Sequence, residues 1–235
     1  MNRFNLIDNI RGIAFILMFI QHIFYLYDVN NEYTTSISSH SLISFIGFIS
    51  RHIFLFLTGY SLVMTYNNKN KKSYLYDRLK RSLLTLCHAL IISCITYYYY
   101  PSYYIRFGVL HFLGLSTLIL SPIIPYKSLY PLLLFITIYL RINKKIIPKI
   151  NPFIDTILGS NISYNMMDYF SLINYIPIVV LGMTASYIDK NILLKLDILN
   201  EEGIITKIGK NTLNLYTIHF VGLILFYVNF FNKKL

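Results

Sequence analysis

The sequence predicts an all-α fold, a polytopic membrane helix bundle with about seven transmembrane helices. Of its 235 residues, 55% are hydrophobic and only 13% are charged, about half the charged share of an ordinary soluble domain. The mean hydropathy is +0.53, and apolar residues fall in long runs near the roughly 20 residues that a membrane-crossing helix needs. We therefore expect one integral membrane domain over residues 1–235.

Seven apolar runs are the expected membrane spans. The first lacks the small-residue cleavage site of a signal peptide, so we interpret it as a retained helix. The fifth is the least typical because it is short. In chain order, the runs are Ile10–Tyr27, Leu42–Thr65, Ser82–Tyr99, Phe107–Ile124, Leu129–Leu140, Leu172–Ile188 and Ile208–Phe231.

The net charge of +11 would suggest a nucleic-acid partner in a soluble chain. Here, however, much of the Lys and Arg lies in short segments between apolar runs, which is the positive-inside pattern of a multi-pass membrane protein. We therefore expect a lipid bilayer and no nucleic acid as partner. The segment between the second and third spans predicts a cytoplasmic loop and a cytoplasmic N-terminus. Its basic residues are Lys69, Lys71, Lys72, Arg78, Lys80 and Arg81.

One later basic segment conflicts with this topology. Strict alternation of seven spans places Arg141, Lys144, Lys145 and Lys149 on the outer side, against the positive-inside rule. Either the short fifth span is re-entrant, or the charge bias is overridden there.

Ionisable side chains within apolar runs are costly, and they mark candidate functional sites. Arg11 and His22 lie eleven residues apart on the first span, close to three helical turns, so both project from one face about 16 Å apart. A long anionic molecule beside that helix would place its phosphates near Arg11 and its reactive end near His22. The alternative is structural: Arg11 reaches lipid headgroups and pairs with Asp8, while His22 forms a helix-packing hydrogen bond.

Other polar residues in the apolar runs indicate a lined cavity. Arg51 and His52 lie amid the second run, where a partner or a water-filled pocket is expected. His111 lies between Gly108 and Gly114 in the fourth run. These glycines permit either close helix packing or approach of the backbone to a ligand.

Two acidic residues are expected on the outer side. Asp28 lies in the first outer loop, and Asp168 lies just before the sixth span. Both are candidates for binding a substrate, with plain solvation as the alternative. The sequence has no phosphate-binding glycine loop, nucleophile elbow, His-Glu-x-x-His or paired Cys ligands. We therefore expect no metal, and chemistry performed by side chains on membrane helices.

A series of segments spans nearly the whole chain in a characteristic order. They are Leu6–Ala14 followed by Met18 and His22, Arg51–Ser61, Arg78–Arg81, Phe107–Gly114, Asp168–Leu172 with Leu181 and Gly182, and Ile208–His219. This series resembles the catalytic domain of heparan-alpha-glucosaminide N-acetyltransferases and their bacterial relatives. The closing segment is similar to one shared across a wider membrane acyltransferase superfamily, and the spacing of Arg11 and His22 resembles that superfamily's acyl-donor motif.

The resemblance implies a membrane-bound acyltransferase that takes an acetyl group from cytosolic acetyl-coenzyme A. The acceptor would be an amine or hydroxyl of a sugar or glycan on the other side of the membrane, and related enzymes suggest a homodimer. The base would be His22, or instead His40, because lysosomal members carry a proposed catalytic histidine in the first luminal loop. The remaining donor-binding candidates are Arg11, Arg78 and Arg81 for the phosphates, and Arg51 or His111 for the thioester oxyanion.

A non-enzymatic transporter or channel for an organic anion is the alternative function. In such a protein, intramembrane Arg and His would carry the solute, and acetyl-coenzyme A would not be consumed. A third interpretation is a member of the family that has lost activity and acts as a structural or interaction protein.

Overall fold

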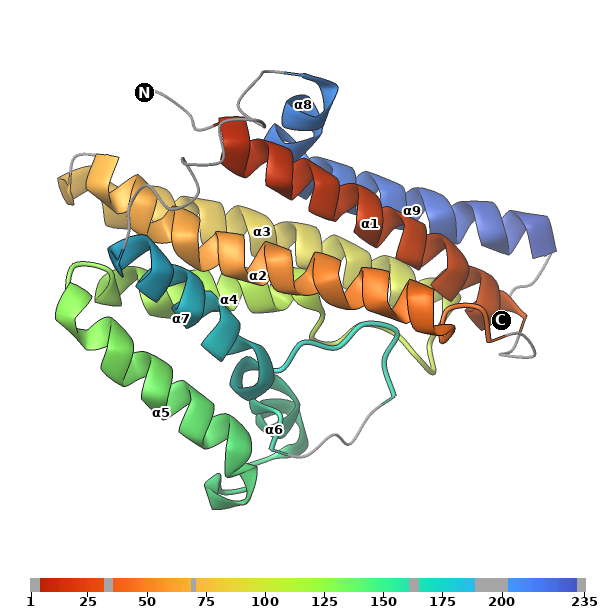
Figure 1. Cartoon of the computed structure of the whole chain (residues 1–235). Coiled ribbons are helices and arrows are strands. Elements are labelled where there is room, and N and C mark those ends of the chain that lie inside the picture. The colour runs from red at the N-terminus through yellow and green to blue at the C-terminus, as the bar shows by residue number, and fades with distance from the viewer. Residues whose placement is uncertain (1–4, 32–35, 69–70, 161–164, 189–202, 232–235) are drawn as a thin grey trace. The chain divides into compact units, whose positions relative to one another are not determined.

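The computed structural model describes residues 5–31, 36–68, 71–160, 165–188 and 203–231. Within these ranges the chain forms helices and no strand, which confirms the all-α class. The α-helices, labelled in Figure 1, are α1 (Asn5–Asn30), α2 (Ser41–Asn68), α3 (Lys71–Tyr99), α4 (Val109–Leu120), α5 (Tyr130–Ile142), α6 (Pro152–Leu158), α7 (Leu172–Ile188), α8 (Ile204–Lys210) and α9 (Thr212–Phe231). Short 3-10 turns are η1 (Ser121–Ile123), η2 (Lys127–Leu129) and η3 (Lys144–Ile146).

The expected count of about seven spans is not confirmed. Among the described residues, four helices are long and apolar enough to cross a membrane, namely α1, α2, α3 and α9, or five spans if the bent pair of α4 and α5 counts as one. The chain bends by 119° between the two arms of that pair. Because α4 has only 12 residues, it extends about 18 Å, well short of the roughly 30 Å hydrocarbon layer.

The bent pair bears on the conflict over the basic segment after the fifth run. A pair of this kind is either one broken span or a re-entrant loop. The re-entrant arrangement is one of the two solutions that the sequence left open for this segment. α7, with 17 residues, is also shorter than the four long spans.

The helices group into two compact units. Unit 1 comprises Met1–Phe54 and Leu193–Leu235, and unit 2 comprises Leu55–Ile192. The boundary falls within α2, so the first part of this helix belongs to unit 1 and the rest to unit 2.

Unit 1 is built around α1, with α8 and α9 packed against it. Two contacts set the direction of α9: His219 meets His22, and the Tyr227 hydroxyl donates to the Ile23 carbonyl at 3.0 Å. Since the later residue of α9 meets the later residue of α1, the two helices run in the same direction (Figure 1). The first part of α2 packs on the same helix, where the Ser50 hydroxyl donates to the Ala14 carbonyl at 2.6 Å.

Small residues allow α8 to reach the backbone of α1. A Cβ on Gly209 would overlap the carbonyl oxygen of Asp8, and one on Gly12 would overlap the carbonyl oxygen of Ile205. Close backbone approach through small residues is typical of helix contacts in membranes. A buried hydrogen bond of 2.5 Å from the Thr206 hydroxyl to the Asn9 side chain holds the two helices in register.

In unit 2, glycines allow the same close backbone approach between α2 and α7. A Cβ on Gly59 would overlap the Val179 carbonyl oxygen, and one on Gly182 would overlap the Phe56 carbonyl oxygen. Elsewhere in this unit, α3 packs against α4. There the buried Ser82 hydroxyl donates to the Gly114 carbonyl at 2.6 Å.

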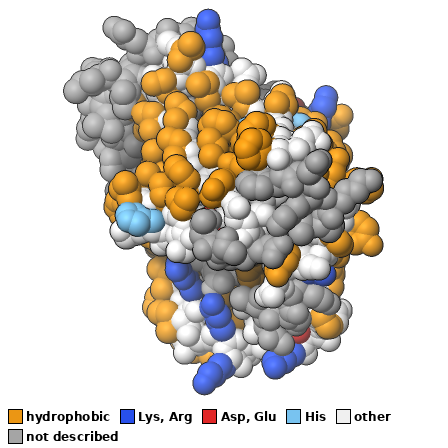
Figure 2. All heavy atoms as spheres, turned by 90° about the vertical axis from the view of Figure 1, so that its right-hand side faces the viewer, with side chains coloured by type: hydrophobic (Ala, Val, Ile, Leu, Met, Phe, Trp, Pro, Cys, Tyr) orange, Lys and Arg blue, Asp and Glu red, His pale blue; other side chains and the backbone are white. Residues whose placement is uncertain are grey.

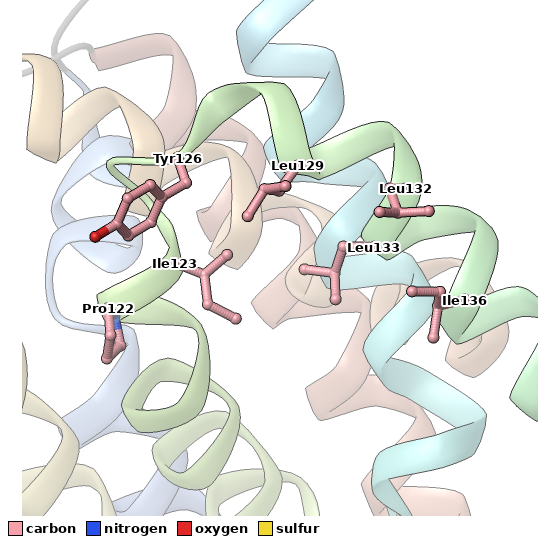
Figure 3. Close-up of a pocket in the computed structure, with 7 residues that line it drawn as sticks. All are labelled: Pro122, Ile123, Tyr126, Leu129, Leu132, Leu133 and Ile136. Carbon is pink, nitrogen blue, oxygen red and sulfur yellow. The ribbon is translucent and has the colours of Figure 1, made fainter.

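Apolar side chains cover much of the outer surface, as the face in Figure 2 shows. On α3 they include Leu75, Leu79 and Leu83, each 44–52% exposed. A surface of this kind is costly in water and is normal against lipid. An open apolar groove also lies at the bend between α4 and α5 (Figure 3), lined by Pro122, Ile123, Tyr126, Leu129, Leu132, Leu133 and Ile136.

Candidate active site

Two histidines from opposite ends of the sequence meet inside unit 1. His22 on α1 is 9% exposed, and its Nδ1 lies 3.0 Å from Nε2 of His219 on α9. The two rings are stacked, with centroids 5.3 Å apart and planes inclined by 9°. The parallel packing of α1 and α9 brings them together across 197 positions of sequence.

Aromatic rings enclose this histidine pair. Phe15 and Phe19 of α1 meet the His219 ring edge to face, and Tyr216 and Phe220 of α9 meet His22 in the same way. Such rings pack favourably at centroid distances of about 4.5–7 Å. They keep the histidine pair in largely apolar surroundings, where a hydrogen bond is stronger than it is in water.

The hydrogen-bond pattern selects the tautomer of both histidines. Nδ1 of His219 lies 2.9 Å from the Leu215 carbonyl oxygen, which can only accept, so that nitrogen carries a proton. In a neutral His219, Nε2 is then an acceptor, and it receives a hydrogen bond from the Nδ1–H of His22. The Nε2 of a neutral His22 is left with its lone pair. A lone pair on an oriented imidazole is the requirement for a general base.

Two cations accompany the pair within unit 1. Arg51 on α2 is half-buried and lies close enough to act electrostatically on His22. Arg11 lies on the unbroken helix α1, so the eleven-residue spacing from His22 keeps both on one face. Arg11 pairs with Asp8 at 2.9 Å, as its structural interpretation predicts.

The loop before α2 carries the other proposed base. His40 is exposed there. The buried carboxylate of Asp28 accepts hydrogen bonds from the backbone N–H of Ser38 at 2.6 Å and of Ile37 at 3.3 Å. Asp28 lies near the end of α1 rather than in the loop that the sequence predicted for it, and it anchors the loop that leads to His40. Its proposed contact with a substrate stays a prediction.

In unit 2, His111 and Asp168 converge on the beginning of α4. The Asp168 carboxylate accepts from the Val109 N–H at 2.9 Å, and Nδ1 of His111 accepts from the Gly108 N–H at 3.3 Å. Both satisfy backbone donors at a helix N-terminus, where they would otherwise be unpaired. A Cβ on Gly108 would lie 2.6 Å from the Asp168 oxygen, so glycine is required for this approach.

The two arginines proposed for phosphate binding differ in their surroundings. Both lie on α3 in unit 2, but Arg78 is buried whereas Arg81 is exposed. Only Arg78 therefore belongs to an enclosed site.

His219 is the residue that the sequence did not select. It ends the closing segment of the series of motifs, Ile208–His219, and that position was the one available signal. Its partner is 197 positions away, and no helical periodicity links residues on two different helices.

A family model described as the catalytic domain of heparan-alpha-glucosaminide N-acetyltransferase matches residues 3–221. The match covers all nine α-helices that the structure describes, except the end of α9. No curated protein and no solved structure significantly matches the chain.

Proposed function

Because the chain belongs to the heparan-alpha-glucosaminide N-acetyltransferase catalytic family, we propose that it acetylates a sugar or glycan across the membrane. The donor is acetyl-coenzyme A on the cytoplasmic side. The acceptor is an amine or hydroxyl on the opposite side. The family and the long apolar helices together support a membrane-bound acetyltransferase.

The observation that carries the mechanism is the oriented pair of His22 and His219. Nε2 of His22 removes the proton from the acceptor while the acceptor nitrogen or oxygen attacks the thioester carbonyl. The new C–N or C–O bond forms as the C–S bond breaks. The departing thiolate of coenzyme A then receives the proton held by His22. His219 acts as a positioning residue, because it fixes which nitrogen of His22 is basic.

Arginine side chains supply the positive charge that the oxyanion and the phosphates of the donor need. Arg51, near His22, stabilises the oxyanion that develops on the thioester carbonyl, since preorganised positive charge is most effective in a dry site. Arg11, at the other end of the shared helix face, binds phosphate of the donor. In unit 2, the proposed phosphate ligands are Arg78 and Arg81, and His111 is a second candidate for the oxyanion.

The test is acetyl transfer by the purified protein in lipid nanodiscs. Radiolabelled acetyl-coenzyme A is supplied with a panel of amino sugars and glycans, and His22→Ala is compared with His40→Ala. We expect His22→Ala to lower the rate by about 10²–10⁴-fold, the usual contribution of a general base. His52→Ala is the matched control, because its Nδ1 bonds to the Phe48 carbonyl of its own helix, at 2.7 Å, and not to His22.

Loss of transfer in His40→Ala with normal transfer in His22→Ala would move the base to the loop before α2. Binding of acetyl-coenzyme A without consumption, with every acceptor, would contradict the enzymatic proposal. It would favour transport of an organic anion instead. Thermal unfolding of each variant in the same nanodiscs separates loss of chemistry from loss of folding.

A further inference from the structure

A buried cation lies in unit 2, and no carboxylate among the described residues is paired with it. Arg78 on α3 is 9% exposed. Its Nε is fully buried, and no acceptor for its hydrogen is present among the described residues. The guanidinium carbon lies 5.6 Å from the centre of the Tyr74 ring.

Tyr74, over whose ring Arg78 lies, belongs to a cluster of three tyrosines from different elements. Tyr66 of α2 meets the Tyr74 ring edge to face at 5.1 Å, and Tyr130, at the start of α5, interacts electrostatically with both. Tyr74 and Tyr130 are fully buried. Arg78 with Tyr66, Tyr74 and Tyr130 is called the Arg78 site below.

Among the described residues, the burial of this guanidinium is compensated only in part, because its Nε–H has no acceptor there. Removing the ion from water is costly unless it is both paired and hydrogen-bonded. One aromatic ring at this distance returns only a fraction of that cost. The fork of N–H donors on Arg matches an oxyanion that accepts two parallel hydrogen bonds.

The position of Arg78 along α3 indicates which kind of anion can reach it. Arg78 lies seven residues after the start of α3 at Lys71, about 10 Å along the helix. It is thus near the end of a candidate span that begins at Ser73. This is the level at which basic pockets between membrane helices meet phosphate-bearing headgroups.

From these observations we infer that Arg78 binds a phosphate group, held by its guanidinium beside the tyrosine cluster. Two sources carry this group, an anionic phospholipid in the membrane and the acyl donor. The apolar groove at the bend is compatible with the lipid source. It includes Ile123 and Leu129, which adjoin Ile124 and Tyr130, and the Tyr130 hydroxyl donates to the Ile124 carbonyl at 2.5 Å. The donor source rests on the proposed function, whereas the lipid source is independent of it.

Binding is measured on the whole chain, without catalysis. Native mass spectrometry counts phosphatidylglycerol retained by protein taken from mixed nanodiscs. Equilibrium dialysis measures labelled coenzyme A in nanodiscs of phosphatidylcholine alone. Arg78→Gln removes the charge at similar length, and Lys80→Gln is the control, because Lys80 is exposed on the same helix.

We expect Arg78→Gln to weaken binding of one probe by at least tenfold, and Lys80→Gln to change it by less than threefold. Loss of phosphatidylglycerol identifies the lipid source, and loss of coenzyme A identifies the donor. Coenzyme A binding that survives Arg78→Gln while phosphatidylglycerol is lost leaves the acetyltransferase proposal intact. Equal losses in both variants would overturn the inference, because they would show a general effect of surface charge.

A second measurement uses the wild-type protein and tests the inference even if Arg78→Gln fails to fold. Inorganic phosphate is added to the wild-type protein in phosphatidylcholine nanodiscs, with chloride at matched ionic strength as the control. The inference requires at least one of phosphate, coenzyme A and phosphatidylglycerol to raise the unfolding temperature above that in chloride. If phosphate, coenzyme A and phosphatidylglycerol all leave the wild-type unfolding temperature unchanged, the Arg78 site does not bind phosphate.

Discussion

Replacing His219 with Phe tests the orientation of the proposed base. Phe keeps a ring among Phe15, Phe19 and Tyr216, but it removes the Nε2 acceptor that lies 3.0 Å from His22 Nδ1. Leaving a buried donor unsatisfied costs about 1–3 kcal/mol. If that cost falls on the reactive tautomer of His22, the rate of acetyl transfer falls by about 5–150-fold.

A direct measurement of the tautomer accompanies the rate. ¹⁵N-labelled histidine NMR of the wild-type protein should show protonated Nδ1 in both His22 and His219, since each Nδ1 donates in the structure. In His219→Phe the His22 signal should lose this locked form, whereas His52→Phe should leave it unchanged. If His22 keeps the same tautomer and full activity without His219, the positioning role is wrong.

Three further outcomes test the fold and the placement of the site. Gly209→Ala should lower the unfolding temperature by several degrees, because its Cβ would overlap the Asp8 backbone and overpacking costs about 1–3 kcal/mol; Gly222→Ala on α9, with open space around it, should have no such effect. Asp168→Ala should destabilise the protein by about 1–3 kcal/mol through the lost acceptor for Val109 N–H, and Asp168→Asn should cost less, as measured by denaturant unfolding. Because α1 and α9 run in the same direction, accessibility tags placed just before α1 and just after α9 should report opposite sides of the membrane; labelling from one side alone would contradict the parallel packing.

Much of the fold could be predicted from local features of the sequence. Long apolar runs identify membrane helices because every buried backbone group must be satisfied within the segment. Each of the seven expected runs does contain a helix. The number of membrane spans could not be predicted in the same way, because hydropathy does not reveal a bend of 119° between two short helices. That bend turns the fourth and fifth runs into one bent pair.

The candidate site, like the fold, could be predicted from the sequence only in part. Periodicity along one helix correctly placed Arg11 and His22 on a common face of α1, and the i, i+3 spacing predicted the ion pair of Arg11 with Asp8. The burial of Arg78 and the capping contact of Asp168 with α4 were not visible in the sequence. Each depends on which helices become neighbours.

The sequence by itself determined the membrane environment, the helical class and the family, because hydropathy, charge placement and motif order are properties of the linear chain. Only the tertiary structure decided that His22 meets His219 and that its Nδ1 donates to that partner. The physical reason is that the tautomer depends on a backbone carbonyl and a ring on α9, nearly the full length of the chain away from α1. Contacts between distant helices are fixed by close packing, which here depends on small residues such as Gly12 and Gly209.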